Sequence, residues 1–298
     1  MLWTFLIPAA IFSVVTLLVN PMILVSILKK DKLRKETRYI LLANLMVSDL
    51  IFLLFNSIIS TCNVIRWYVH KILCYTMIVF TFASYSSCVL TFTAMVVDTY
   101  LAICFPLHYY SLLSMQRTKK ILVAIWIFSI LFPLSVFLTS ETFDGDTLKR
   151  QNVCLMLYYG PDERKNTLVT IVCSCAIFFL MICSVMITYF YVKLYTMTRK
   201  SGIWVHRFSR ARITLLTHSI LLGLYIVPAF ILTAEIMMFK NNVISMNARM
   251  WISACNNGLM MVMPRALSPL LYGLRYREIA ATLKHWISRN RVSSDSCT

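Results

Sequence analysis

The chain has 298 residues, of which 59% are hydrophobic and only 14% charged, and its formal net charge is +17. Soluble domains average about 45–50% apolar residues, and the apolar runs here lack the polar stripes that soluble helices carry. The composition argues against a soluble domain and favours an all-α membrane protein. The basic residues stand between the apolar runs, which indicates a membrane surface and no nucleic acid as their partner.

Seven apolar segments follow one another, at about residues 2–28, 37–62, 72–104, 119–139, 167–196, 211–237 and 248–273. Each reaches the ~20 residues that a membrane-spanning helix needs. We expect a seven-transmembrane helix bundle over residues 1–275, followed by a short amphipathic helix and cytoplasmic tail over 276–298. For the first segment a cleaved signal peptide is the alternative. That segment has no basic start and runs unbroken to Leu28, so a spanning helix is preferred.

The distribution of basic residues predicts the orientation. With the N-terminus outside, the cytoplasmic segments hold 20 of the 29 Lys and Arg residues, and Arg265 lies within the seventh segment. The outer segments hold the other eight, which are Arg66, Lys71, Lys149, Arg150, Arg164, Lys165, Lys240 and Arg249. By the positive-inside rule, this bias predicts a multi-pass plasma-membrane protein with its C-terminus in the cytoplasm.

Enzyme and metal chemistry find no support. Seven of the ten cysteines lie in or beside apolar runs, where they are read as small buried hydrophobes. The chain has neither a Cys-x-x-Cys pair nor a His-x-x-x-His ladder, and its spans hold neither paired acids nor a cluster of metal ligands. We therefore expect no metal, no cofactor and no enzymatic activity.

Single polar residues interrupt the first two spans. Asn20 lies in the first span, and the second contains the run Asn44-Leu45-Met46-Val47-Ser48-Asp49-Leu50. A carboxylate such as that of Asp49 is costly inside a bilayer, so it is functional or paired by default.

The third span ends in a longer motif, Asp98-Thr99-Tyr100-Leu101-Ala102-Ile103-Cys104-Phe105-Pro106-Leu107-His108-Tyr109. This run resembles the end of the third helix of rhodopsin-like (class A) G-protein-coupled receptors, whose usual form is Asp-Arg-Tyr-x-Ala-Ile-x-x-Pro-Leu-x-Tyr. Asn20 and the Asn44 to Leu50 run resemble the family's first and second helices. In the family, the aspartate corresponding to Asp49 helps to bind sodium and couples the ligand site to the inner face.

The resemblance also implies a disulfide. Trp67 stands seven residues before Cys74, as in the family's first outer loop, and Cys154 is the only cysteine of the second outer loop. Cys74 and Cys154 are therefore the expected pair, in an oxidising compartment. The bridge would hold that loop across the mouth of the bundle.

Thr99 departs from the family, which has an arginine at this position. In relatives that arginine holds the inactive state through its neighbouring aspartate and contacts the G protein in the active state. Thr99 can make neither charged contact. Either basal activity rises because a restraint is lost, or coupling is weak, and the sequence leaves both open. Pro106, Leu107, Arg210 and Arg212 are the expected G-protein contacts, and arrestin is a second expected partner.

The sixth span resembles the family in part. Tyr225-Ile226-Val227-Pro228 keeps the family's proline but has Ile226 in place of the switch tryptophan. The run Thr217-His218-Ser219 is similar to odorant receptors, and the surrounding pattern is similar to an orphan receptor of the same family.

The seventh span ends with Ser268-Pro269-Leu270-Leu271-Tyr272, where the family has Asn-Pro-x-x-Tyr. Arg265 precedes Pro269 by four residues and so lies on a similar face. We hypothesise an ion pair between Arg265 and Asp49, with the guanidinium standing where relatives hold sodium. The alternative is that Arg265 lines a water-filled cavity without a fixed partner.

A ligand pocket is expected between the outer halves of the third, fifth, sixth and seventh spans. Its candidate residues are Thr81, Phe82, Tyr85, Phe230, Thr233, Asn256 and Asn257. Amine receptors usually have an aspartate at the position of Thr81, so a biogenic amine is not expected. The candidate switch residues are Asn20, Asp49, Asp98, Thr99, Tyr100, Pro228, Arg265, Ser268, Pro269 and Tyr272.

The expected function is that of an orphan class A receptor which transduces an unknown extracellular ligand to a heterotrimeric G protein. A chemosensory receptor is one alternative. A seven-helix scaffold with weak or no coupling is another, because Thr99, Ile226 and Ser268 all depart at switch positions. A transporter or channel is less favoured, because no internal repeat is visible and Asp49 and Arg265 are the only strong mid-span charges.

Overall fold

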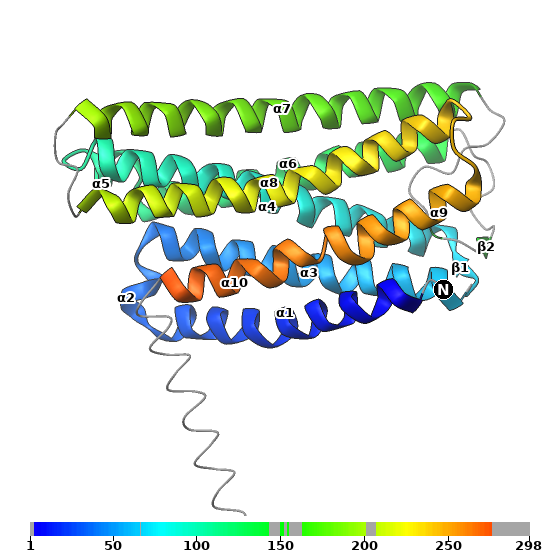
Figure 1. The fold of residues 1–298 in the computed structure, drawn as a ribbon, viewed down its shortest axis with the longest axis horizontal. Coiled ribbons are helices and arrows are strands. Elements are labelled where there is room, and N and C mark those ends of the chain that lie inside the picture. Colours follow the sequence, from blue (N-terminus) through cyan, green and yellow to red (C-terminus); the bar gives the residue numbers. More distant parts are fainter. Residues whose placement is uncertain are drawn as a thin grey trace, which may run out of the picture.

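The computed structural model describes residues 3–65, 67–142, 150–151, 154, 163–200 and 207–275. Its long helices lie side by side along one axis (Figure 1), and the all-α membrane bundle is confirmed. They are α1 (Trp3–Lys29), α3 (Thr37–Ile65), α4 (Lys71–Cys104), α6 (Met115–Thr142), α7 (Glu163–Lys200) and α8 (Arg207–Lys240). The short helices α2 (Asp31–Arg34) and α5 (Tyr109–Leu112) join α1 to α3 and α4 to α6.

Six helices are long and apolar enough to cross a membrane, counted over the described residues. The spans are Ile7–Lys29, Thr37–Asn63, Ile72–Cys104, Met115–Ser135, Ser174–Lys193 and Ser219–Phe239. Large apolar side chains such as Val14, Leu131 and Phe178 are exposed on these helices. In water such a surface would be costly, whereas in a bilayer it faces hydrocarbon.

The seventh apolar segment, expected at about residues 248–273, is interrupted in the structure. It consists of α9 (Met246–Cys255), the π-helical η1 (Asn256–Met260) and α10 (Met263–Arg275). Pro264 contributes to this break because it has no N–H to donate to the preceding turn. Exposed backbone carbonyls inside a membrane must find other donors.

Helix α4 is the centre of the bundle, since it packs against α3, α6, α7 and α8. We name the two ends of the bundle after the residues of α4 that lie there. At the Cys74 end, β1 (Val69–His70) pairs antiparallel with β2 (Arg150–Gln151). At the Asp98 end lie α2 and α5 (Figure 1). The expected amphipathic helix over 276–298 lies outside the described residues.

Candidate functional site

The disulfide between Cys74 and Cys154 is present, as predicted, with the two Cα atoms 5.6 Å apart. Asn63 adds two hydrogen bonds that the sequence analysis missed. Its Nδ2 donates to the carbonyl of Cys154 at 3.0 Å, and its Oδ1 accepts from the amide of Cys154 at 2.7 Å. The segment around Cys154 is therefore tied to α3 as well as to α4.

The hypothesised contact between Arg265 and Asp49 is also present. Arg265 Nε lies 3.4 Å from Asp49 Oδ1, and both side chains are fully buried. The pair joins α10 to α3 in the middle of the bundle. A buried pair is strongly destabilised by removal of one partner, because the remaining charge is left without compensation.

The broken helix explains how the guanidinium is accommodated. The amide of Arg265 bonds to the carbonyl of Val262, three residues back. The carbonyl of Met261 instead accepts a hydrogen bond from Arg265 Nη1. Arg265 thus supplies from its own side chain the donor that the interrupted backbone lacks.

Aromatic rings surround the Arg265 guanidinium. Its central carbon lies 3.4 Å from the ring centroid of Phe52, 5.1 Å from that of Tyr225 and 5.6 Å from that of Tyr85. The faces of such rings attract cations, particularly where water is absent. Arg265 Nη2 has no hydrogen-bond partner among the described residues, so these ring faces stabilise the part of the cation that Asp49 does not reach.

Asp49 collects donors from three other helices. Tyr225 Oη of α8 donates to Oδ1 at 2.8 Å, and Cys88 Sγ of α4 lies 3.4 Å from the same atom. Ser268 Oγ of α10 is 3.4 Å from Oδ2. We call the set of Asp49, Cys88, Tyr225, Arg265 and Ser268 the polar node. It connects α3, α4, α8 and α10 at one point.

Two proline sites adjoin the polar node. Pro228 breaks the hydrogen-bond ladder of α8, and its carbonyl accepts from Asn256 Nδ2 of η1 at 2.9 Å. Pro269 is buried in α10.

Asn20 of α1 is fully buried, and its side-chain amide has no hydrogen-bond partner among the described residues. Tyr272 belongs to α10, and its side chain lies outside the described set.

At the Asp98 end of the bundle, Tyr109 donates a hydrogen bond to the carboxylate of Asp98. Tyr109 Oη donates to Asp98 Oδ1 at 2.6 Å, which links α5 to α4. Burial, followed by this hydrogen bond and the charge of Asp98, raises the pKa of Tyr109 above its ordinary value. The tyrosine therefore stays protonated and remains a donor. The sequence motif contained Tyr109 but gave no sign of this partnership.

The residues that follow Asp98 contact their own helix or the neighbouring helix α7. Thr99 Oγ1 donates to the carbonyl of Met95 in its own helix at 2.9 Å. The ring of Tyr100 packs against Phe190 of α7 with centroids 5.0 Å apart. The proposed G-protein contacts Pro106 and Leu107 are exposed between α4 and α5. The two others, Arg210 and Arg212, lie in α8, and their side chains are outside the described set.

The expected ligand-pocket residues do not all face one another. Thr81, Tyr85, Thr233 and Asn256 are buried, and Phe82 and Asn257 are partly buried. Phe230 is 36% exposed and lies with Ile220, Gly223 and Val227 on the exposed stripe of α8. Thr81 and Thr233 direct their hydroxyls to carbonyls of their own helices, Met77 and Ala229, at 2.8 and 2.7 Å. These two threonines therefore contribute mainly to packing.

A second buried ion pair lies away from the middle of the spans, near the end of α8 and the start of α9. Arg249 Nε of α9 lies 3.4 Å from Glu235 Oε1 of α8, and both side chains are nearly inaccessible. The Arg249 guanidinium also lies over the Phe239 ring at 4.5 Å. Arg249 was counted among the basic residues of a loop, whereas it stands in the first turn of α9.

Metal ligands do not cluster in the part of the chain that the structure describes, where no group of three His, Cys, Asp or Glu side chains is found. The described residues instead form three features along the bundle. These are the Cys74–Cys154 disulfide at one end, the charged polar node in the middle and the Tyr109–Asp98 hydrogen bond at the other end.

Comparison with known proteins identifies relatives over nearly the whole chain. The family described as 7 transmembrane receptor (rhodopsin family) matches residues 19–280. The human protein "Probable G-protein coupled receptor 148" is 32% identical over 291 residues, which cover 97% of this chain and 83% of that protein. The zebrafish protein "Odorant receptor 131-2" is 28% identical over 280 residues, covering 91% of this chain and 82% of its own length.

Proposed function

Because the chain belongs to the rhodopsin family of seven-transmembrane receptors, we propose that it transduces an unidentified extracellular ligand to a heterotrimeric G protein. Ligand binding near the Cys74 end shifts the bundle between two conformations, and the Asp98 end presents the altered surface to the G protein. Arrestin is a second cytoplasmic partner in this proposal.

Two independent features support an orientation with the Cys74 end outside the plasma membrane. Disulfides persist in oxidising compartments, so the Cys74–Cys154 bridge supports an extracellular position for that end. The excess of Lys and Arg in the segments that connect at the Asp98 end supports a cytoplasmic position for the other end.

The polar node is the observation that carries the proposal. A bundle needs no charge in its centre for stability, since apolar packing of the same volume is usually as good. A fully buried ion pair that touches four helices is therefore better explained by a switching role. Movement of α8 or α10 on ligand binding changes the donors that Asp49 receives, so the polar node can pass the change to α3 and α4.

The test is ligand-free second-messenger output in cells, for wild type and Thr99→Arg at matched surface expression. High wild-type output that Thr99→Arg reduces supports a receptor that signals without its inner lock. A silent wild type with output gained in Thr99→Arg supports an intact bundle whose coupling interface is weakened. Both results support transduction through this bundle. Silence of both proteins across a ligand panel favours a non-signalling scaffold and counts against the proposal.

A chemosensory receptor is the second candidate. The match to the zebrafish odorant receptor over 91% of this chain favours it. The two candidates separate on ligand chemistry, since small volatile or amino-acid-like odorants should evoke output only in the chemosensory case. Screening the same cells with such a panel and with peptide and lipid mediators distinguishes them.

A further inference from the structure

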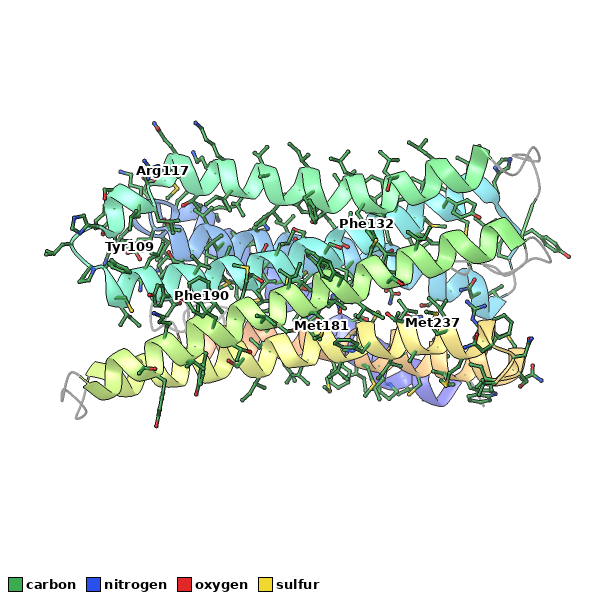
Figure 2. The ribbon with its side chains drawn as sticks, turned by 90° about the horizontal axis from the view of Figure 1, so that it is seen from above. Tyr109, Arg117, Phe132, Met181, Phe190 and Met237 are labelled. Carbon is green, nitrogen blue, oxygen red and sulfur yellow. A yellow bond between two sulfur atoms is a disulfide. The ribbon has the colours of Figure 1, made fainter. Side chains whose placement is uncertain are left out.

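An apolar groove lies on the bilayer-facing side of the bundle, between α6 and α7 with α4 as its floor. Its volume is about 320 Å³, and it is lined by Leu90, Ile121, Ala124, Ile125, Phe128 and Phe179. In Figure 2, α6 and α7 approach each other towards one end and diverge towards the end that holds Arg117. Helix α4 packs against both of them.

The groove is open towards the surrounding hydrocarbon, and an aromatic contact lies on its Cys74 side. Phe128 is 53% exposed and Ile121 is 37% exposed, so the outer wall is accessible. The rings of Phe128 and Phe179 meet with centroids 5.8 Å apart, where α6 and α7 approach each other. These two rings are the lining residues of α6 and α7 that meet on the Cys74 side of the groove, so we expect an acyl chain to enter from the Asp98 side.

The depth of the groove matches one leaflet. The apolar helix Met115–Ser135 carries Arg117, Lys119 and Lys120 before Ile121. Long basic side chains extend back to the headgroups, so we take the hydrocarbon on this helix to begin near Ile121. From Ile121 to Phe128, α6 rises about 10 Å at 1.5 Å per residue. One leaflet contributes roughly 15 Å of the hydrocarbon core. The groove therefore ends before the bilayer midplane and accommodates the first part of one acyl chain.

Basic side chains stand at the open end. Lys120 precedes Ala124 by four residues, and Arg117 precedes Ile121 by four, so each lies one turn below a lining residue. Both are exposed. Arg117 Nη1 donates to the carbonyls of Ser111 and Leu112 at 2.5 and 3.1 Å, which holds the guanidinium at the start of α6. By the helical rotation of 100° per residue, Lys119 points to the other side of α6.

We propose that this groove binds an anionic glycerophospholipid of the leaflet on the Asp98 side. One acyl chain lies against Leu90, Phe128 and Phe179, and the headgroup contacts Lys120 and Arg117. Apolar lining alone would accept any lipid, whereas the two basic residues select a negative headgroup. This site adds a lipid partner to the receptor function, and in the proposed orientation the leaflet is the cytoplasmic one.

The test uses the purified full chain in phosphatidylcholine vesicles that contain a trace of a photoactivatable probe. The probe is phosphatidylserine or phosphatidylcholine with the same diazirine-bearing acyl chain, and peptide mass spectrometry locates the adducts. We expect adducts on the α4, α6 and α7 peptides that line the groove. We expect labelling by the serine probe to exceed that by the choline probe by about fivefold for each basic side chain.

Two pairs of variants sharpen the result. Lys120→Gln should lower the preference for the serine probe about fivefold, whereas Lys119→Gln, on the other side of α6, should leave it unchanged. Ala124→Trp fills the groove and should remove its adducts with both probes, whereas Val123→Trp, at a position 59% exposed on another face, should not.

Three results would overturn the proposal. Adducts spread evenly over all exposed apolar helix faces would mean ordinary bilayer contact. Equal labelling by the two probes in wild type would remove the headgroup selectivity. Loss of groove adducts on addition of unlabelled cholesterol, with no effect of Lys120→Gln, would assign the groove to a sterol.

Discussion

Two ion pairs of this bundle share one geometry but have different surroundings. In each, an arginine Nε lies 3.4 Å from a carboxylate oxygen, Arg265 with Asp49 and Arg249 with Glu235. Asp49 also receives Tyr225, Cys88 and Ser268, whereas Glu235 Oε2 has no hydrogen-bond partner among the described residues. The distance between the charges therefore does not distinguish the two pairs. They differ in the number of helices that each pair connects.

The two ion pairs also differ in how far they lie from the ends of their helices. Asp49 stands 12 residues inside α3, so its charge cannot reach water from that position. Glu235 stands five residues before the end of α8, close to the turn that leads to α9. Loss of one partner from the first pair would leave a charge far from water. Loss of one partner from the second pair would leave a charge near the end of α8, where a small displacement of the helix end would admit water.

Arg265→Ala should have the largest effect. It leaves the Asp49 charge buried without its partner, which costs roughly 3–5 kcal/mol, and surface expression should collapse. Asp49→Asn combined with Arg265→Gln should partly restore expression, because neither charge then remains. Surface labelling and thermal unfolding in detergent measure both. Equal damage from the single and the double variant would show that the two side chains do not act as a pair.

Tyr225→Phe should come next. It removes the 2.8 Å hydrogen bond to Asp49 but keeps the ring beside Arg265 and Phe92. A hydrogen bond to a charged group contributes about 1.5–3 kcal/mol, so the unfolding temperature should fall and basal signalling should change with it. Tyr189→Phe, at an exposed position of α7, is the matched control. A full loss of stability with unchanged signalling would make Tyr225 a packing residue only.

Arg249→Ala should cost less, about 1–2 kcal/mol against the roughly 3–5 expected for Arg265→Ala. Glu235 is buried in the folded chain, but it lies near the end of α8, so a small displacement of that end would expose its carboxylate to water. Asn247→Ala, exposed in the same first turn, controls for the helix start. Thermal unfolding of both variants beside Arg265→Ala gives the ranking. If Arg249→Ala proves as damaging as Arg265→Ala, the contrast between the two pairs disappears.

Tyr109→Phe should have the smallest effect, about 1 kcal/mol. Its hydrogen bond also goes to a carboxylate, but Tyr109 is only partly buried, so water can replace its hydroxyl as a donor to Asp98. The pKa of Tyr109 is raised in the folded chain from the ordinary 10.0, so its contribution is complete below pH 10 and is lost as the pH rises further. The free energy of unfolding, measured from about pH 8 to about pH 11 on either side of that value, should fall more steeply with pH for wild type than for Tyr109→Phe. The neighbouring Tyr110, which is 82% exposed, supplies Tyr110→Phe as the control. Identical slopes in all three proteins would show that ionisation of Tyr109 does not contribute to the pH dependence of stability.

Faces of helices were hard to predict for a physical reason. In soluble proteins a polar stripe marks the outer face of a helix, but α8 is apolar on all sides. The sequence therefore gave no sign that Phe230 points outward while Thr233 points inward. The same problem hid Tyr225, although a tyrosine hydroxyl within a span needs a partner and was a usable signal.

The length and composition of each segment settled the fold class, because a bilayer demands about 20 apolar residues per span and tolerates few charges. The motif around Asp98 gave the family, and the lone loop cysteine gave the disulfide to Cys74. The tertiary structure alone brought Tyr109 to Asp98, Asn63 to Cys154 and Arg249 to Glu235. These contacts join different elements, so they depend on how the helices pack and turn against one another. Local composition carries no record of that packing.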